Sequence, residues 1–118
     1  MSVEHHDAVL AATSHLPHLL AYALVDMLAR LDDSREIFAY AAGGFRDFTR
    51  IASSDPVMWR DISLANRDAI VSMLKKYRAE VDGLIAAVAA GDGGKLETLF
   101  ARAKAARDAL VTNDLKRD

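Results

Sequence analysis

Apolar residues recur at spacings of three, four and seven along most of the chain, as in helices that bury one face. A first helix is expected from about Glu4 to Leu31. Pro17 lies inside this segment. Because proline lacks a backbone donor and crowds the carbonyl four residues earlier, it should kink the helix or split it near Ser14. No stretch alternates apolar and polar residues with β-branched enrichment, so we expect an all-α fold.

Capping and breaking residues mark the next two helices. Asp33 or Ser34 supplies an N-cap for a short helix that should extend to about Ala42. The pair Gly43-Gly44 is expected to end this helix and let the chain turn. A further helix is expected over residues 45–52.

The clearest helix start is the sequence SSDP, in which Asp55 caps and Pro56 takes the first helical position. Helical periodicity continues from there to Ala90, with a break expected near Ser63–Asn66. Within it, residues at alternating spacings of four and three form a short seam typical of packed helices: Ile70, Leu74, Tyr77, Val81, Leu84 and Val88.

Glycines divide the final helix from this long one. The sequence GDGG at residues 91–94 should end the long helix, and a last helix is expected from Lys95 to about Val111. The tail TNDLKRD is expected to fray, because chain ends are poorly held.

Composition narrows the class of protein. A chain of 118 residues with 52% hydrophobic and 27% charged residues is expected to form one globular domain. A net charge of −2, from 15 basic and 17 acidic residues, gives no reason to propose nucleic acid or an anionic membrane as partner. The absence of cysteine excludes disulfides and thiolate chemistry. We expect no apolar run of membrane-spanning length and no signal peptide, and therefore a cytoplasmic protein.

All four histidines fall within the first 18 residues, as His5, His6, His15 and His18. A helical metalloenzyme is one interpretation, but neither a Glu-x-x-His pair nor a His-Glu-x-x-His pattern is present, and it ranks last. A half-buried structural histidine is the simpler interpretation for His5. For His15 and His18, which bracket Pro17 in the sequence SHLPH, the expected local opening of the helix favours a pocket wall.

The sequence GGFRDFTRIASSDPVMWRDI, residues 43–62, combines arginines with the chain's one tryptophan. Arg46 and Arg50 are four residues apart and share a helix face, and Asp47 could orient either one. A guanidinium group holds a carboxylate in a bidentate fork, and Trp59 could add a cation–π wall. Free N–H groups after Gly43-Gly44 would add an anion site. The alternative is a pair of solvated arginines on an amphipathic helix.

Taken together, SHLPH and the segment 43–62 resemble the C-terminal domain of the prephenate and arogenate dehydrogenases, over about residues 6–90. The resemblance implies an all-helical, bundle-like dimerisation domain of the 6-phosphogluconate-dehydrogenase-like type. These enzymes oxidise and decarboxylate prephenate or arogenate with NAD or NADP in tyrosine biosynthesis.

The resemblance also implies site residues. Arg50 would grip a substrate carboxylate, while Ser14, His15 and His18 would line the pocket and His6 would contribute. Gly43, Asp47 and Trp59 would lie near the site at a homodimer interface. Residues 1–118 would form this single domain, with no catalytic, cofactor-binding or metal-binding residue of its own.

Two features of the family have no counterpart in this sequence. They are the Gly-x-Gly-x-x-Gly turn of a dinucleotide-binding domain and the family's catalytic histidine, both expected upstream of Met1. The chain alone is therefore expected to be inactive and to bind no cofactor. The sequence does not decide between prephenate and arogenate or between NAD and NADP. The alternative is a stand-alone helical module for carboxylate binding or dimerisation, without catalysis.

Overall fold

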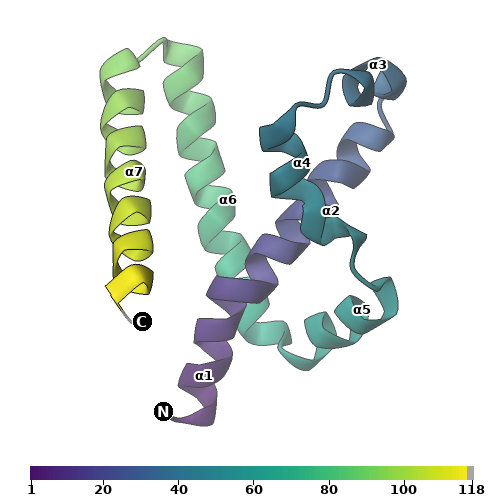
Figure 1. The fold of residues 1–118 in the computed structure, drawn as a ribbon, viewed down its shortest axis with the longest axis vertical. Coiled ribbons are helices and arrows are strands. Elements are labelled where there is room, and N and C mark those ends of the chain that lie inside the picture. Colours follow the sequence, from purple (N-terminus) through teal and green to yellow (C-terminus); the bar gives the residue numbers. More distant parts are fainter. Residues whose placement is uncertain (117–118) are drawn as a thin grey trace. The chain divides into compact units, whose positions relative to one another are not determined.

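The computed structural model describes the backbone of residues 1–116 and the side chains of residues 1–112, and these residues contain helices and no strand. The chain divides into two compact units, Met1–Lys76 and Tyr77–Asp118. Figure 1 shows the order of the elements along the chain. The expected all-α fold class is confirmed, because the described residues form helices and no strand.

The first unit begins with one uninterrupted helical stretch made of three elements: α1 (Val3–Leu10), the π-helical turn η1 (Ala11–His15) and α2 (Leu16–Ala29). Ser2 caps α1, because its side-chain oxygen accepts a hydrogen bond from the backbone N–H of His5 at 3.1 Å. The predicted disturbance near Ser14 is confirmed as the π turn, which interrupts the α-helical pattern without ending the helix.

Three short elements follow: α3 (Ser34–Ala39), α4 (Gly43–Thr49) and the 3-10 turn η2 (Arg50–Ser53). All three pack against α2. Two expectations are wrong here. The helix after Asp33 ends at Ala39 instead of Ala42, and Gly43-Gly44 open α4 instead of separating it from the preceding helix. Helical dihedral angles are open to glycine too, so the turn is completed before Gly43, where Ala42 is extended.

The predicted helix start at Asp55 is confirmed. Its carboxylate accepts the backbone N–H of Val57 at 3.0 Å, and α5 (Pro56–Ala65) begins with the proline. The break expected within residues 63–66 is also confirmed, because Asn66 alone separates α5 from α6 (Arg67–Ala90).

The second unit is a helical hairpin formed by the later part of α6 and by α7 (Gly93–Lys116), as Figure 1 shows. Gly91 has φ +66°, and this left-handed residue lets Asp92 donate to the carbonyl of Ala87 at 2.9 Å in a Schellman turn. The carboxylate of Asp92 then accepts the N–H of Lys95 at 3.0 Å and caps α7. The last helix thus begins earlier and runs further than expected, while the end of the tail, residues 117–118, lies outside the described residues.

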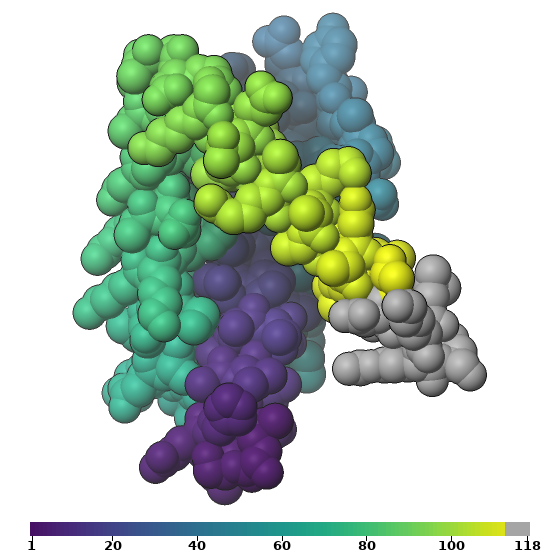
Figure 2. All heavy atoms as spheres, turned by 90° about the vertical axis from the view of Figure 1, so that its left-hand side faces the viewer, coloured from purple at the N-terminus to yellow at the C-terminus, as the bar shows by residue number. Residues whose placement is uncertain are grey.

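Few apolar side chains are buried among the described residues. The buried set is small: Ala11, Ala21, Trp59, Ile70 and Ala87. Most side chains of α7 up to Thr112 are exposed (Figure 2). Several large apolar side chains of α6 and α7 are exposed: Val71, Tyr77, Ile85, Val88, Phe100, Leu110 and Val111. Exposed apolar surface of this extent is typical of a chain that associates with another surface.

The N-terminal stretch Val3–Ala29 is also apolar on its surface. Its most apolar window has a mean hydropathy of 1.4, and by length and composition alone the helix could cross a membrane. The expectation that no apolar run reaches this length is therefore wrong. One such helix near an N-terminus is weak evidence for a membrane span, because a helix of a soluble domain passes the same test.

Candidate functional site

Pro17 gives the candidate site its local backbone. In a regular α-helix the proline ring would press on the carbonyl of Thr13, four residues earlier. The π turn contains one more residue per hydrogen-bonded ring, and the N–H of Leu16 bonds to the carbonyl of Ala11 instead of Ala12. Such turns relieve the crowding and often accompany functional sites. Ser14 and His15 lie within this turn, and His18 follows one residue after the proline.

His18 is held by its own helix and by α5. Its Nδ1 donates to the carbonyl of Ser14 at 2.8 Å, so the side chain satisfies a backbone acceptor next to the proline. Its ring stacks on the indole of Trp59, with ring centroids 3.8 Å apart and an interplanar angle of 17°. These two contacts define where the imidazole lies, because one holds its edge and the other its face.

His15 contacts the same tryptophan from a different direction. The two rings meet edge to face, with centroids 5.9 Å apart and an interplanar angle of 79°. Partial burial and the neighbouring His18 lower the pKa of His15 below its ordinary value, while Asp7 opposes them by raising it. His15 is therefore expected to be neutral at pH 7.

Trp59 joins the histidines into one cluster. It projects from the first turns of α5, and it is 7% exposed. Its indole Nε1 is buried, and among the described residues no acceptor lies within hydrogen-bonding distance of it. His18 covers one face of the indole, so an expected cation–π contact with an arginine would have to use the other face.

A small, mainly apolar cavity of about 200 Å³ lies beside this cluster, between α2 and α5. It is lined by Leu19, Tyr22, Pro56, Trp59, Arg60 and Ser63. The hydroxyl of Tyr22 donates to the carbonyl of Ser54 at 2.6 Å and ties α2 to the segment before α5. The arginine at this cavity is Arg60, which pairs with Asp61 at 2.9 Å.

Two other arginines, Arg46 and Arg50, precede Ser54 in the sequence and lie in α4 and η2. Arg50 is the first residue of η2, which packs against α2, and its side chain is exposed. Arg46 bonds through Nε to the carbonyl of Ala41 at 3.3 Å. The carboxylate of Asp47 is exposed and makes no ion pair with either arginine in the described part of the chain. The expectation that Asp47 orients an arginine is therefore not met within this chain.

The remaining expected residues lie at the surface. Gly43 is the exposed first residue of α4, and because this helix has only seven residues we assign no anion site to its N-terminus. His6 is exposed on α1, with its Nδ1 3.5 Å from the carboxylate of Asp7. The described residues contain no group of three or more metal-ligating side chains.

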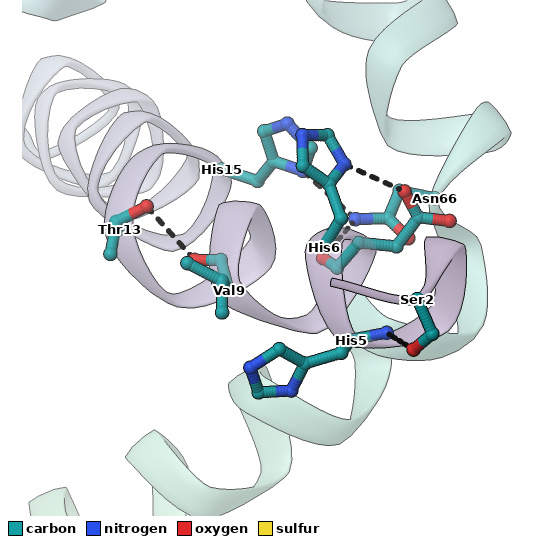
Figure 3. A network of polar contacts seen from close by, with 8 residues as sticks. Ser2, His5, His6, Val9, Thr13, His15 and Asn66 are labelled. Atoms are coloured by element: carbon teal, nitrogen blue, oxygen red, sulfur yellow. Dashed lines mark hydrogen bonds and ion pairs between the residues drawn. The ribbon is translucent and has the colours of Figure 1, made fainter.

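Two residues of the site were missed by the sequence analysis. Tyr22 was not predicted, because nothing in the sequence indicates that a tyrosine on a long apolar helix bonds to the distant residue Ser54. Asn66 was noted only as part of a helix break. Its side chain reaches back to α1 and η1, donating to the carbonyl of Asp7 at 2.9 Å and lying 3.2 Å from Nδ1 of His15 (Figure 3).

Comparison with known proteins identifies the family. Residues 2–102 match the model of the dimerisation domain of prephenate dehydrogenase. A cyclohexadienyl dehydrogenase from Zymomonas mobilis is 44% identical over 115 residues, which are 96% of this chain and 39% of that enzyme.

Solved structures agree with this match. The structure of prephenate dehydrogenase from A. aeolicus in complex with hydroxyphenyl propionate and NAD⁺ is 38% identical, with a TM-score of 0.86 over 93% of this chain and 39% of that one. The Synechocystis arogenate dehydrogenase is 26% identical, with a TM-score of 0.88 over 93% of this chain and 41% of that one.

These matches show that the chain resembles one part of several dehydrogenases, and it belongs to the prephenate dehydrogenase dimerisation-domain family. It spans about two fifths of the length of these relatives, which are oxidoreductases.

Proposed function

We propose that the chain is the dimerisation and substrate-binding domain of a cytoplasmic dehydrogenase that oxidises and decarboxylates prephenate or arogenate for tyrosine biosynthesis. The observation that carries this proposal is the family match over residues 2–102, together with a similar structure that holds hydroxyphenyl propionate and NAD⁺. The histidine–tryptophan cluster beside a cavity adds a site in which a ring-shaped ligand would find apolar and polar contacts.

NAD or NADP would be held by a separate dinucleotide-binding domain. The described residues do not fit a dinucleotide, because Gly43-Gly44 lie in the first turn of α4 and no strand precedes them. The 118-residue chain would bind and orient the substrate. The dinucleotide-binding domain would supply the cofactor and the general base. The chain by itself is then expected to be inactive.

Within this domain Arg50 is proposed to hold a substrate carboxylate. The residue is exposed and therefore accessible to a ligand, and its element η2 packs against α2, the helix that carries His18. Prephenate has two carboxylates, of which one leaves as carbon dioxide. A clamp on the other carboxylate would orient the substrate and leave the departing group weakly held. Ser14, His15 and His18 would form the pocket wall and His6 would contribute to it, while Gly43, Asp47 and Trp59 would lie near the site at the interface of a homodimer.

The test compares Arg50→Ala with Arg46→Ala in the full-length enzyme. Both variants remove one exposed guanidinium from neighbouring turns, so Arg46→Ala controls for the loss of surface charge. A charge-assisted hydrogen bond contributes about 1.5–3 kcal/mol, which predicts a KM raised roughly 10- to 150-fold in Arg50→Ala and little change in Arg46→Ala. Arg50→Lys should recover part of the loss, since lysine keeps the charge without the fork. An unchanged KM in Arg50→Ala would remove Arg50 from the substrate site.

A further inference from the structure

Asn66 occupies the single position between two helices. Its backbone N–H donates to the carbonyl of Ile62 at 3.1 Å and ends α5, while its carbonyl accepts from Ile70 at 3.1 Å and begins α6. The Asn66 side chain makes no capping hydrogen bond to either helix, because its amide nitrogen bonds elsewhere. That half-buried side chain instead points toward α1 and η1, as Figure 3 shows.

The amide group of Asn66 has only one orientation that satisfies its neighbours. The carbonyl of Asp7 can only accept a hydrogen bond, so the atom 2.9 Å away must be the amide nitrogen, not the amide oxygen. The same nitrogen lies 3.2 Å from Nδ1 of His15. An amide nitrogen has two protons and no acceptor capacity, so one proton serves Asp7 and the second faces the imidazole.

This arrangement decides which nitrogen of His15 carries the proton. Nδ1 faces a donor and must accept, so the proton of the neutral ring resides on Nε2. The opposite holds for His18, whose Nδ1 faces the carbonyl of Ser14 and must donate, which leaves its Nε2 as the acceptor. The two rings that contact Trp59 are thus chemically different: one has Nε2 as a donor, the other as an acceptor.

We propose that Asn66 is a positioning residue that holds His15 as the Nε2–H tautomer, so that His15 offers its ligand a hydrogen-bond donor while His18 offers an acceptor. The inference rests on the proposed function in one respect, since it takes His15 and His18 as walls of the substrate site. A hydrogen-bond donor at neutral pH from an uncharged ring would suit a carboxylate or hydroxyl oxygen of the substrate. Protonation of Nδ1 would place two donors face to face, and Asn66 therefore also opposes the imidazolium form.

The discriminating variant is Asn66→Asp, which keeps the shape of the side chain and replaces the donor with an acceptor. The Nε2–H form is also the commoner one for a free imidazole in water, so simply removing the amide tests the idea poorly. With a carboxylate at this position, Nδ1 of His15 should become protonated. Ser72→Asp, at an exposed position on α6, is the control that adds the same charge elsewhere.

The measurement is a long-range ¹H–¹⁵N correlation spectrum of the histidine side chains in the 118-residue chain at pH 8. The signal of His15 is assigned by its loss in His15→Gln. The unmodified chain and Ser72→Asp should show an unprotonated Nδ1 and a protonated Nε2 for His15, and Asn66→Asp should show a protonated Nδ1. A protonated Nδ1 in the unmodified chain would overturn the proposal even if Asn66→Asp failed to fold. An unchanged His15 pattern in a folded Asn66→Asp would overturn it too.

A kinetic measurement separates this inference from the proposed function. In the full-length enzyme, loss of one donor should lower kcat/KM of Asn66→Asp roughly tenfold, with no change in Ser72→Asp. A switched tautomer with an unchanged kcat/KM would refute the positioning role of Asn66. The proposed function fails separately, if the full-length enzyme oxidises neither prephenate nor arogenate. The spectrum is independent of that result, because it is recorded without substrate.

Discussion

Replacement of Trp59 tests whether the histidine cluster is also the main packing centre of the first unit. A tryptophan buries about 150–250 Å², and Trp59 is only 7% exposed. At about 25 cal/mol per Å², some 200 Å² corresponds to roughly 5 kcal/mol as an upper estimate. Trp59→Ala should therefore lower the free energy of unfolding by about 3–5 kcal/mol, the usual range for truncating a buried aromatic residue.

Trp59→Phe should cost far less, for a reason specific to this structure. The smaller ring gives up roughly 50 Å² of buried area, or about 1 kcal/mol. It also removes the indole N–H, which has no acceptor among the described residues, and a buried unpaired donor costs about 1–3 kcal/mol. The two effects offset each other, and stacking on His18 is kept. The net change should lie within about 1 kcal/mol of zero.

Urea unfolding followed by circular dichroism at 222 nm measures both variants, at one protein concentration because association shifts apparent stability. If Trp59→Phe lost more than half as much stability as Trp59→Ala, the reasoning would be refuted. The indole N–H would then have a partner, or the rings would not be stacked.

Two further predictions concern association and pH. Ile85→Glu, on the exposed apolar surface of α6, should shift a homodimer toward monomer in sedimentation at several concentrations, whereas Ser72→Glu on the same helix should not; equal behaviour of the two variants would place the interface elsewhere. The pKa of His15 is lower in the folded state, so the unfolded chain binds more protons. The contribution of His15 to the free energy of unfolding is therefore fully present above about pH 6.5, and it is lost as the pH falls from there through the folded pKa. Thermal unfolding between pH 8 and pH 5 should show a smaller loss in His15→Gln, and an identical loss would contradict the assignment.

Local signals in the sequence were sufficient for most of the fold. Asp55 with Pro56, the glycines after Ala90 and the helix-disturbing Pro17 each act over one or two turns, and all three appear where expected. The predicted helix boundaries at Gly43-Gly44 and at the end of α7 were wrong. The residue types there are compatible with a helix, and the packing of the neighbouring chain decides whether the helix includes them.

The candidate site was predicted only in part. The sequence SHLPH identified His15 and His18, because proline makes a local break visible in the sequence. Their shared contact with Trp59 joins residues more than 40 positions apart, and no spacing rule reports such a contact. The contact from Asn66 to Asp7 spans 59 positions for the same reason. The proposed role of Arg50 stays a prediction that rests on family resemblance.

The stacking of His18 on Trp59 also gives the protein an internal optical probe. Trp59 is the chain's single tryptophan, so all indole fluorescence comes from the ring that contacts both histidines. An excited indole loses its emission by electron transfer to a protonated imidazole in contact with it, whereas a neutral imidazole quenches it much less. The emission intensity therefore reports the charge of this histidine pair without an added label. It also reports the binding of any ligand that changes that charge.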